Sequence, residues 1–282
     1  MVTHTKMEYQ HIDAASIGSG RWALRHEILS ILHGHGLRRA EAQAQVESRA
    51  MPAGIMVIPI HGLIMPRGDW LSELFGMFSL TSFRARLREA INNEDVTSVV
   101  LDIDSPGGLV DGVPETAAEI RQARETKKIV AVANTEAASA AYWLASQASE
   151  IVAQPSAEVG SIGVFMLHRD VSAAMDQLGV KHTFISAGKY KTDGNPYEPL
   201  ADDARDYLQS QVDDTYDMFT SDVATGRGVK KSVVEKEYGQ GRMLGAKAAL
   251  SAGMIDRIGT LEKEISGRRR GTRTQSHRMA FI

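Results

Sequence analysis

Ser139 is the residue whose type and position most directly suggest chemistry. It lies between the apolar run 129–133, which is typical of a buried strand, and the helix-favouring stretch 140–147. A hydroxyl at the start of a helix meets N–H groups that have no partner within the helix, and the positive end of the helix dipole. Such a serine can act as a nucleophile, but serine is also an ordinary helix N-cap. The other motifs of the chain decide between these two interpretations.

Two adjacent glycines, Gly107 and Gly108, follow the apolar strand pattern 98–104. Glycine lets the backbone turn sharply and present N–H groups without side-chain obstruction. Such donors can hold the oxyanion of an acyl-transfer reaction. A Pro-Gly-Gly triplet alone is more typical of a simple turn, and the surrounding residues lack the spacing of a phosphate-binding loop.

A serine nucleophile needs a base within hydrogen-bond reach. His61, His168 and His182 have no evident orienting acid in the sequence, and we interpret them as packed or surface residues. A neutral lysine is the alternative, provided that burial lowers its pKa from about 10.4 towards about 7–8. Lys189 and Lys191, in the turn-rich loop 187–197, are the candidates.

The elements that must position these residues follow from the hydrophobic pattern. Strand patterns alternate with helical ones, which predicts an α/β fold with a mostly parallel sheet and right-handed crossovers. Gly107, Gly108 and Ser139 then share the carboxyl edge of the sheet, where ligand-contacting loops gather. The expected strands are 55–64, 98–104, 129–133, 150–153 and 181–186, and the expected helices are 81–91, capped by Thr81 or Ser82, 110–126, 201–226 and 229–238.

Three regions are expected along the chain. Residues 1–50 form an N-terminal helical segment, because Trp22, Leu24 and Ile28 recur at helical spacing, and residues 51–265 form the main domain. Residues 266–282 form a basic tail that we expect to be disordered. The apolar segment 69–78 is either a substrate-facing or subunit-facing flap or a core-packed turn, and both interpretations stay open.

Composition excludes several classes of protein. The 282 residues are 43% hydrophobic and 24% charged, which is typical of a soluble globular chain. A net charge of −3 predicts no general affinity for nucleic acid, and the absence of cysteine excludes disulfides, thiolate zinc sites and a cysteine nucleophile. No apolar run has the length of a membrane span, and the polar start is unlike a secretory signal. We therefore expect a cytoplasmic protein without a metal or cofactor.

Four motifs in order carry a resemblance to a known family: 101–108 (LDIDSPGG), 137–143 (AASAAYW), 159–164 (VGSIGV) and 188–191 (GKYK), followed by 253–256 (GMID). Together they resemble the signal peptide peptidase A family of Ser-Lys serine proteases, over roughly 54–261. The resemblance implies a crotonase/Clp-protease-like ββα superhelix that assembles into rings.

Matching positions imply that Ser139 is the nucleophile and Lys191 the general base, with Lys189 as the competing lysine. Backbone N–H groups of Gly107, Gly108 and Ala140 would form the oxyanion hole. Ser161 would orient the lysine. One departure is the Ala140-Ala141 pair, where cellular members often have Gly-Gly, and no membrane anchor is apparent.

A short form with these motifs looks like the phage branch of the family, the capsid-assembly proteases. This implies a homo-oligomer that processes scaffold, portal or capsid proteins during head maturation, in the host cytoplasm or procapsid, with any scaffold a separate product. One alternative is a cellular peptidase acting on signal peptides or damaged proteins. Another is a crotonase-type acyl-CoA enzyme on the same scaffold.

Overall fold

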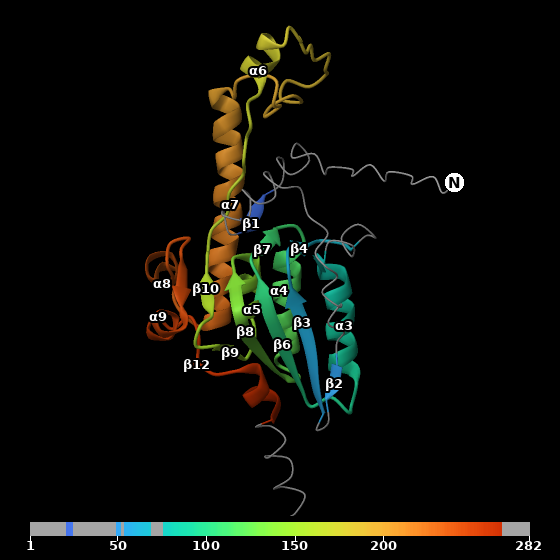
Figure 1. The fold of residues 1–282 in the computed structure, drawn as a ribbon, viewed down its shortest axis with the longest axis vertical. Coiled ribbons are helices and arrows are strands. Elements are labelled where there is room, and N and C mark those ends of the chain that lie inside the picture. Colours follow the sequence, from blue (N-terminus) through green and yellow to red (C-terminus); the bar gives the residue numbers. More distant parts are fainter. Residues whose placement is uncertain (1–20, 25–48, 52–53, 69–75, 267–282) are drawn as a thin grey trace, which may run out of the picture.

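The computed structural model describes residues 21–24, 49–51, 54–68 and 76–266. Within them an α/β body carries a long arm (Figure 1). The expected basic tail, the segment 69–75 and the helical pattern beyond Leu24 lie outside the described residues, apart from the short stretch 49–51.

The body is built on a mostly parallel sheet, in the spatial order β11-β10-β8-β6-β3-β2, with β9 and β12 beside β8. The central strands β3, β6, β8 and β10 pair in parallel, and the two edge strands β2 and β11 pair antiparallel. The mixed α/β class and the mostly parallel sheet are therefore confirmed. The strands of this sheet are β2 (Arg49–Met51), β3 (Ile55–His61), β6 (Ser98–Ser105), β8 (Lys128–Ala138), β9 (Glu150–Ala153), β10 (Glu158–Gly160), β11 (Met243–Gly245) and β12 (Arg257–Ile258).

Strand β8 is longer than its partners and changes neighbour along its length. Its first half pairs with β9, and its last residues, 136–138, pair with β10. Both faces of the central strands are apolar, as expected where helices cover a parallel sheet. One face joins the main core with the body helices, and the other carries a smaller apolar cluster around Val100 and Val130. The body helices are α3 (Leu80–Asn92), α4 (Val113–Ala123), α5 (Ala140–Ala145), α8 (Lys231–Glu237) and α9 (Ala246–Ser251).

A second, smaller sheet lies beyond the carboxyl end of β6, in the order β1-β7-β4-β5. Its central strand β7 contains Gly107 and Gly108, and it pairs antiparallel with β1 and parallel with β4. The strands are β1 (Trp22–Leu24), β4 (Ile64–Met65), β5 (Phe78–Ser79) and β7 (Gly107–Leu109). The small sheet thus brings a segment from near residue 20 onto the glycine turn.

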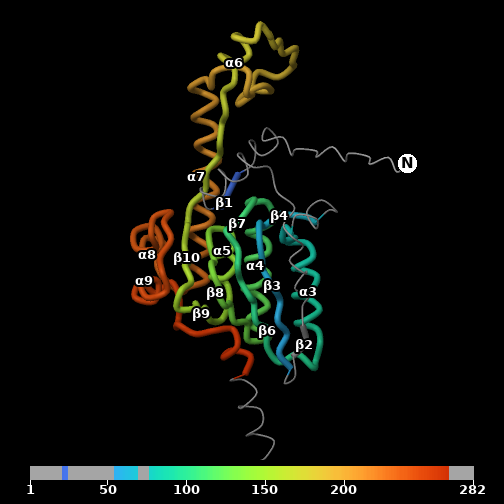
Figure 2. Tube along the Cα trace, in the orientation of Figure 1, coloured from blue at the N-terminus to red at the C-terminus, as the bar shows by residue number. Residues whose placement is uncertain are grey.

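The arm extends from the body along the 26-residue helix α7 (Asp202–Arg227). After β10 the chain runs beside α7 to its far end, where α6 (Ser172–Gln177) and the connection 178–201 lie (Figures 1 and 2). The half of α7 nearest the body is packed, with Phe219 fully buried and its ring stacked on Trp143 at 4.3 Å. The distal part of the arm has no buried core of its own, since residues 172–200 are exposed or half-buried.

The structure confirms some local expectations and corrects others. The long helix expected at 201–226 is confirmed as α7. The expected helix spacing at Trp22 and Leu24 is wrong for those two residues, because they lie in strand β1. Residues 181–186 form no strand, and the cap of α3 is Ser79, whose hydroxyl accepts from the Ser82 N–H group. None of the helices in the described ranges is both long enough and apolar enough to span a bilayer.

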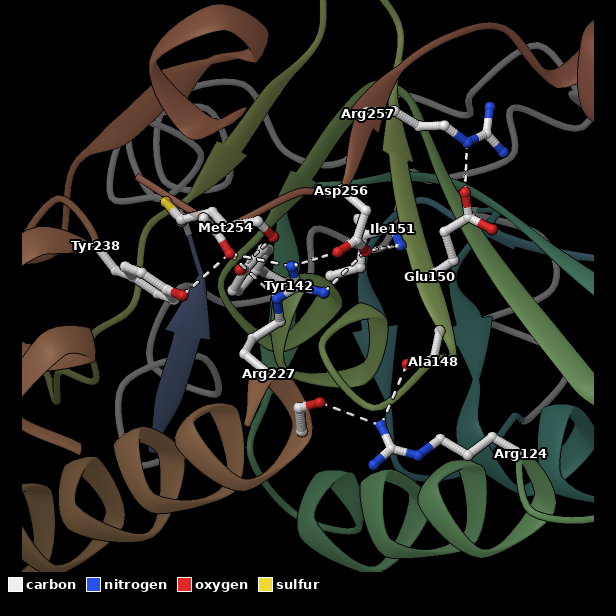
Figure 3. A network of polar contacts seen from close by, with 12 residues as sticks. Arg124, Tyr142, Ala148, Glu150, Ile151, Arg227, Tyr238, Met254, Asp256 and Arg257 are labelled. Carbon is white, nitrogen blue, oxygen red and sulfur yellow. Dashed lines mark hydrogen bonds and ion pairs between the residues drawn. The ribbon is translucent and has the colours of Figure 1, made fainter. Parts of the chain in front are cut away.

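A polar network fastens α5 to the C-terminal part of the body (Figure 3). The buried Tyr142 hydroxyl donates to the Met254 carbonyl at 2.8 Å, and burial raises the pKa of that phenol. Arg227 donates to both carboxylate oxygens of Asp256, at 2.9 and 3.0 Å, and Oδ2 of Asp256 also accepts from the Ile151 N–H group at 2.7 Å. These bonds hold α5, β9 and the end of α7 to one segment, so the helix that begins after Ser139 has a fixed position.

Replacing Asp256 by Asn tests this network. Burial alone raises the pKa of the Asp256 carboxyl, but Arg227 and the Ile151 N–H group outweigh it and lower the pKa below its usual value. A carboxylate whose folded-state pKa is lowered stabilises the fold above its unfolded pKa, and the contribution is lost as the pH falls through the folded value. Because Asp256 is half-exposed, the unfolding free energy of the Asp256→Asn variant should be only about 1–2 kcal/mol lower than that of the wild type at neutral pH.

The measurement is urea denaturation of the wild type and Asp256→Asn at about pH 7 and about pH 3, because unperturbed aspartate titrates near pH 4. The difference between the two proteins should narrow at the lower pH. An equal difference at both values would show that the carboxylate charge does not contribute.

Candidate active site

Ser139 lies at the junction of β8 and α5, as the sequence predicts, but it does not cap the helix. Its hydroxyl makes no capping hydrogen bond, which argues against the ordinary N-cap interpretation. Its backbone has φ 53° and ψ −117°, a strained conformation for a residue with a side chain. The residue is fully buried, and the only described partner of its hydroxyl is the Gly163 carbonyl at 3.5 Å. A hydroxyl held in strain and without a firm partner is suited to nucleophilic chemistry.

The glycine turn lies directly against this serine. Gly107 has φ 97°, and a Cβ added to it would meet the Ala23 carbonyl oxygen at 2.2 Å and the Ser139 Cβ at 3.0 Å. A Cβ on Gly108 would lie 1.9 Å from the Ile64 carbonyl oxygen. Only glycine therefore fits at either position, and the sequence prediction that these residues accompany Ser139 agrees with their geometry.

The expected oxyanion donors are not equivalent. The Gly107 N–H group donates to the Ser105 hydroxyl at 3.2 Å, and that hydroxyl donates to the Gly62 carbonyl at 2.7 Å. The Gly107 N–H group is thus engaged in this structure, and we remove it from the set of donors. Ala140 begins α5, and first-turn N–H groups have no acceptor within their own helix. Gly108 lies opposite Ala23 in the pairing of β7 with β1.

Ser161 follows the residue that accepts a hydrogen bond from Ser139. The Ser139 N–H group donates to the carbonyl of Gly160 at 2.7 Å, and the N–H group of Ser161 donates to the backbone carbonyl of Arg242 at 2.9 Å. Ser161 is buried and has φ 52°. Among the described non-glycine residues only Ser139, Ser161 and Gln240 have positive φ, so two of the three strained positions flank the same contact. Strain of this kind concentrates at functional sites.

The two candidate lysines lie on the arm and not beside Ser139. They belong to the connection between α6 and α7, which Figure 1 shows at the far end of α7, away from α5. Lys191 is exposed, and Lys189 donates to the Tyr190 hydroxyl at 2.9 Å. Within the described part of a single copy, Ser139, Gly108, Ala140 and Ser161 thus lie on the body, whereas Lys189 and Lys191 lie on the arm.

His61 has the orienting acid that the sequence did not reveal, and our expectation on this point is wrong. Its Nε2 lies 3.2 Å from an Asp102 carboxylate oxygen, and this charged contact, opposed by burial, raises the pKa of His61. Asn134 donates to the other Asp102 oxygen at 2.6 Å and accepts from Gln154. The carboxylate contact favours the protonated form of the imidazole. The row of polar residues spans β3, β6 and β8, and only the strand register could have revealed it.

Sequence reasoning also missed strand β1. Trp22 and Leu24 are buried against Leu63, Leu109 and Phe165, while Ala23 faces the main core and is fully buried. Their short apolar alternation is compatible with a helix as well as a strand, and the partner strand is more than 80 residues away.

The fold and site together define a class, an α/β protein with a buried serine at a strained strand-to-helix turn beside a glycine turn. The profile described as Peptidase family S49 matches residues 121–271, which include Ser139, Ser161 and Lys191. This chain belongs to peptidase family S49.

Individual relatives agree with this assignment. The chain is 36% identical over 214 residues to the "Capsid assembly protease C" of Escherichia phage lambda, covering 76% of this chain and 48% of the phage protein. It is 33% identical over 205 residues to the "Head-tail preconnector protein GP5" of Enterobacteria phage P21, covering 73% of this chain and 40% of that protein. It is 31% identical over 192 residues to the "Putative protease slr0021" of Synechocystis, covering 67% of this chain and 69% of that protein. The chain thus spans about half or less of the two phage relatives.

Replacing Gly108 by Ala tests the close approach at the glycine turn. The added methyl group would collide with the Ile64 backbone and should push β7 away from β4, at a cost of about 2–3 kcal/mol. Chemical denaturation measures the loss. Gly245→Ala is the matched control, because a methyl group there meets no described atom within 4 Å. Equal stability of the two variants would contradict the described contact.

Proposed function

We propose that this chain is a serine endopeptidase in which Ser139 is the nucleophile and Lys191 the general base. The observation that carries the proposal is the Ser139 hydroxyl, which is buried at a strained strand-to-helix turn, caps nothing and lies against the glycine turn. Membership of peptidase family S49 supports the class of reaction.

In the proposed reaction the base takes the proton of the Ser139 hydroxyl as its oxygen attacks a peptide carbonyl carbon. The N–H groups of Gly108 and Ala140 hold the oxyanion, and each such donor contributes about 3–4 kcal/mol to the transition state. The base then protonates the departing amine, and water hydrolyses the acyl-enzyme. Ser161 orients the lysine from its position beside Ser139.

We further propose that Lys191 reaches Ser139 from the arm of a neighbouring copy. Three observations support this step. Lys191 is on the arm, the arm exposes large apolar side chains, and one of them, Ile185, is 98% exposed. Such a surface favours association. Docking would also bury the lysine, and burial is the usual means of lowering a lysine pKa into the range of a base.

The phage relatives suggest the substrate class. The lambda protein is named a capsid assembly protease, and 76% of this chain aligns with it. We propose that this chain processes scaffold, portal or capsid proteins during phage head maturation, within the procapsid or the host cytoplasm. A cellular peptidase role is the second candidate, because the Synechocystis relative is matched over 69% of its length.

A fluorophosphonate probe tests the nucleophile. It should label the wild type and Ser251→Ala, whose altered side chain is exposed on α9, but not Ser139→Ala. Lys191→Ala should reduce the labelling rate by about 10²-fold or more, the usual contribution of a general base. Lys189→Ala should have little effect. Unchanged labelling of Ser139→Ala would remove this residue from the role, and loss of labelling only in Lys189→Ala would reassign the base.

Mixing two inactive variants tests whether the arm is shared. A site that combines Ser139 of one copy with Lys191 of another is intact in mixed oligomers of Ser139→Ala and Lys191→Ala. Random exchange of subunits should restore roughly a quarter of the wild-type peptidase activity, since each site then draws its two residues independently. Subunits that exchange but recover no activity would show that each copy uses its own lysine.

A further inference from the structure

Strand β1 is held by backbone hydrogen bonds on both of its edges. On one side it pairs antiparallel with β7, and the Val110 N–H group donates to the Arg21 carbonyl at 3.1 Å. On the other side Trp22 and Phe165 exchange two bonds, N–H to carbonyl in each direction, at 3.0 Å. An extended peptide that completes a sheet in this way is bound as proteins bind peptides by strand addition.

The strand lies directly at the catalytic groups. Its register places Ala23 opposite Gly108 and Leu24 opposite Gly107. The Ala23 carbonyl oxygen and the Ser139 Cβ both lie within 3.0 Å of the point that a Cβ on Gly107 would occupy. Among the atoms around that point, the Ala23 carbonyl is the nearest. The Ala23 carbonyl and the Ser139 side chain thus both lie against the same point of the glycine turn.

The side chains of β1 alternate between two environments. Trp22 and Leu24 share an apolar cluster with side chains that include Leu109 and Phe165, and they are 5% and 3% exposed. Ala23 points to the opposite side, into the main core, and is fully buried. The groove thus accepts an extended segment with a small residue between two large apolar ones.

We propose that the groove between β7 and Phe165 is the substrate groove, and that the chain cleaves itself there between Ala23 and Leu24. The inference rests on the proposed peptidase function and names the first substrate of the site. It also assigns a preference for a large apolar residue, then a small one, then a large apolar one, with cleavage after the small residue. While β1 is bound, no other peptide can pair with β7.

The proposed self-cleavage between Ala23 and Leu24 needs no reagent other than water. The Ser139 oxygen bonds to the Ala23 carbonyl carbon, the bond from that carbon to the Leu24 nitrogen breaks, and the base carries the hydroxyl proton to that nitrogen. Leu24 becomes a new amino terminus. Water then hydrolyses the Ala23 ester, which leaves a carboxylate on Ala23 and restores the hydroxyl of Ser139.

Intact-mass measurement of the full chain during incubation tests the proposal. The wild type should lose the mass of residues 1–23 and start at Leu24, while Ser139→Ala stays intact. Ala23→Trp should be cut at least about 10-fold more slowly, because a fully buried alanine site has no room for an indole. Ala248→Trp, a matched change at an exposed position on α9, should be cut like the wild type.

A synthetic peptide with the sequence of residues 17–28 keeps the test independent of how the Ala23→Trp variant folds. The enzyme should cut it between its Ala and Leu residues, and the same peptide with Trp in place of that Ala should resist. A wild-type chain that reacts with the fluorophosphonate probe but stays intact, or is cut elsewhere, overturns self-cleavage and leaves the peptidase standing. Cleavage of the Ser139→Ala variant at the same bond would show that Ser139 is not needed, and would also overturn self-cleavage. Loss of both labelling and peptide hydrolysis would instead overturn the proposed function itself.

Discussion

The site depends on a close approach of backbones at the glycine turn. The Ala23 and Ile64 carbonyls both lie closer to this turn than any side chain would allow, and Ser139 lies against the same point. Two glycines are the only residues that permit this arrangement without displacing a strand. The small sheet, the position of Ser139 and the path of β1 all depend on this close approach, so the glycine pair organises this part of the structure.

Contacts with the rest of the body hold helix α5 in place. The Tyr142 hydroxyl ties α5 to the Met254 carbonyl, and Trp143 stacks on Phe219 of α7 while its indole N–H group donates to Asp222 at 2.9 Å. Preorganisation of this kind favours catalysis, because donors and nucleophile need no rearrangement when charge develops. The lysine, in contrast, is carried on an exposed arm. The proposed mechanism therefore separates Ser139 on the body from the lysine on the arm that would activate it.

Sequence patterns predicted much of this architecture, and the features that they missed depend on contacts between residues that are distant in the sequence. Long apolar strands alternating with helices gave the parallel sheet, and the junction at Ser139 followed from one strand and one helix. Strand β1 could not be predicted, because three residues show no distinct period and its partners are distant in sequence. Residues 181–186 have a strand-like composition but no neighbouring strand to pair with, since they lie on the arm. The His61–Asp102 contact depends on strand register, which composition does not encode.

The burial of Trp22 has an optical consequence. An indole enclosed by Phe165, Leu109 and Leu63 emits at shorter wavelength than one in water, and the chain has only two other tryptophans, Trp70 and Trp143. Trp143 is fully buried in the body and packed on Phe219, so its surroundings do not depend on the groove. Departure of β1 would thus shift the intrinsic fluorescence of the protein to the red, and the vacating of the groove can be followed in real time without any added dye.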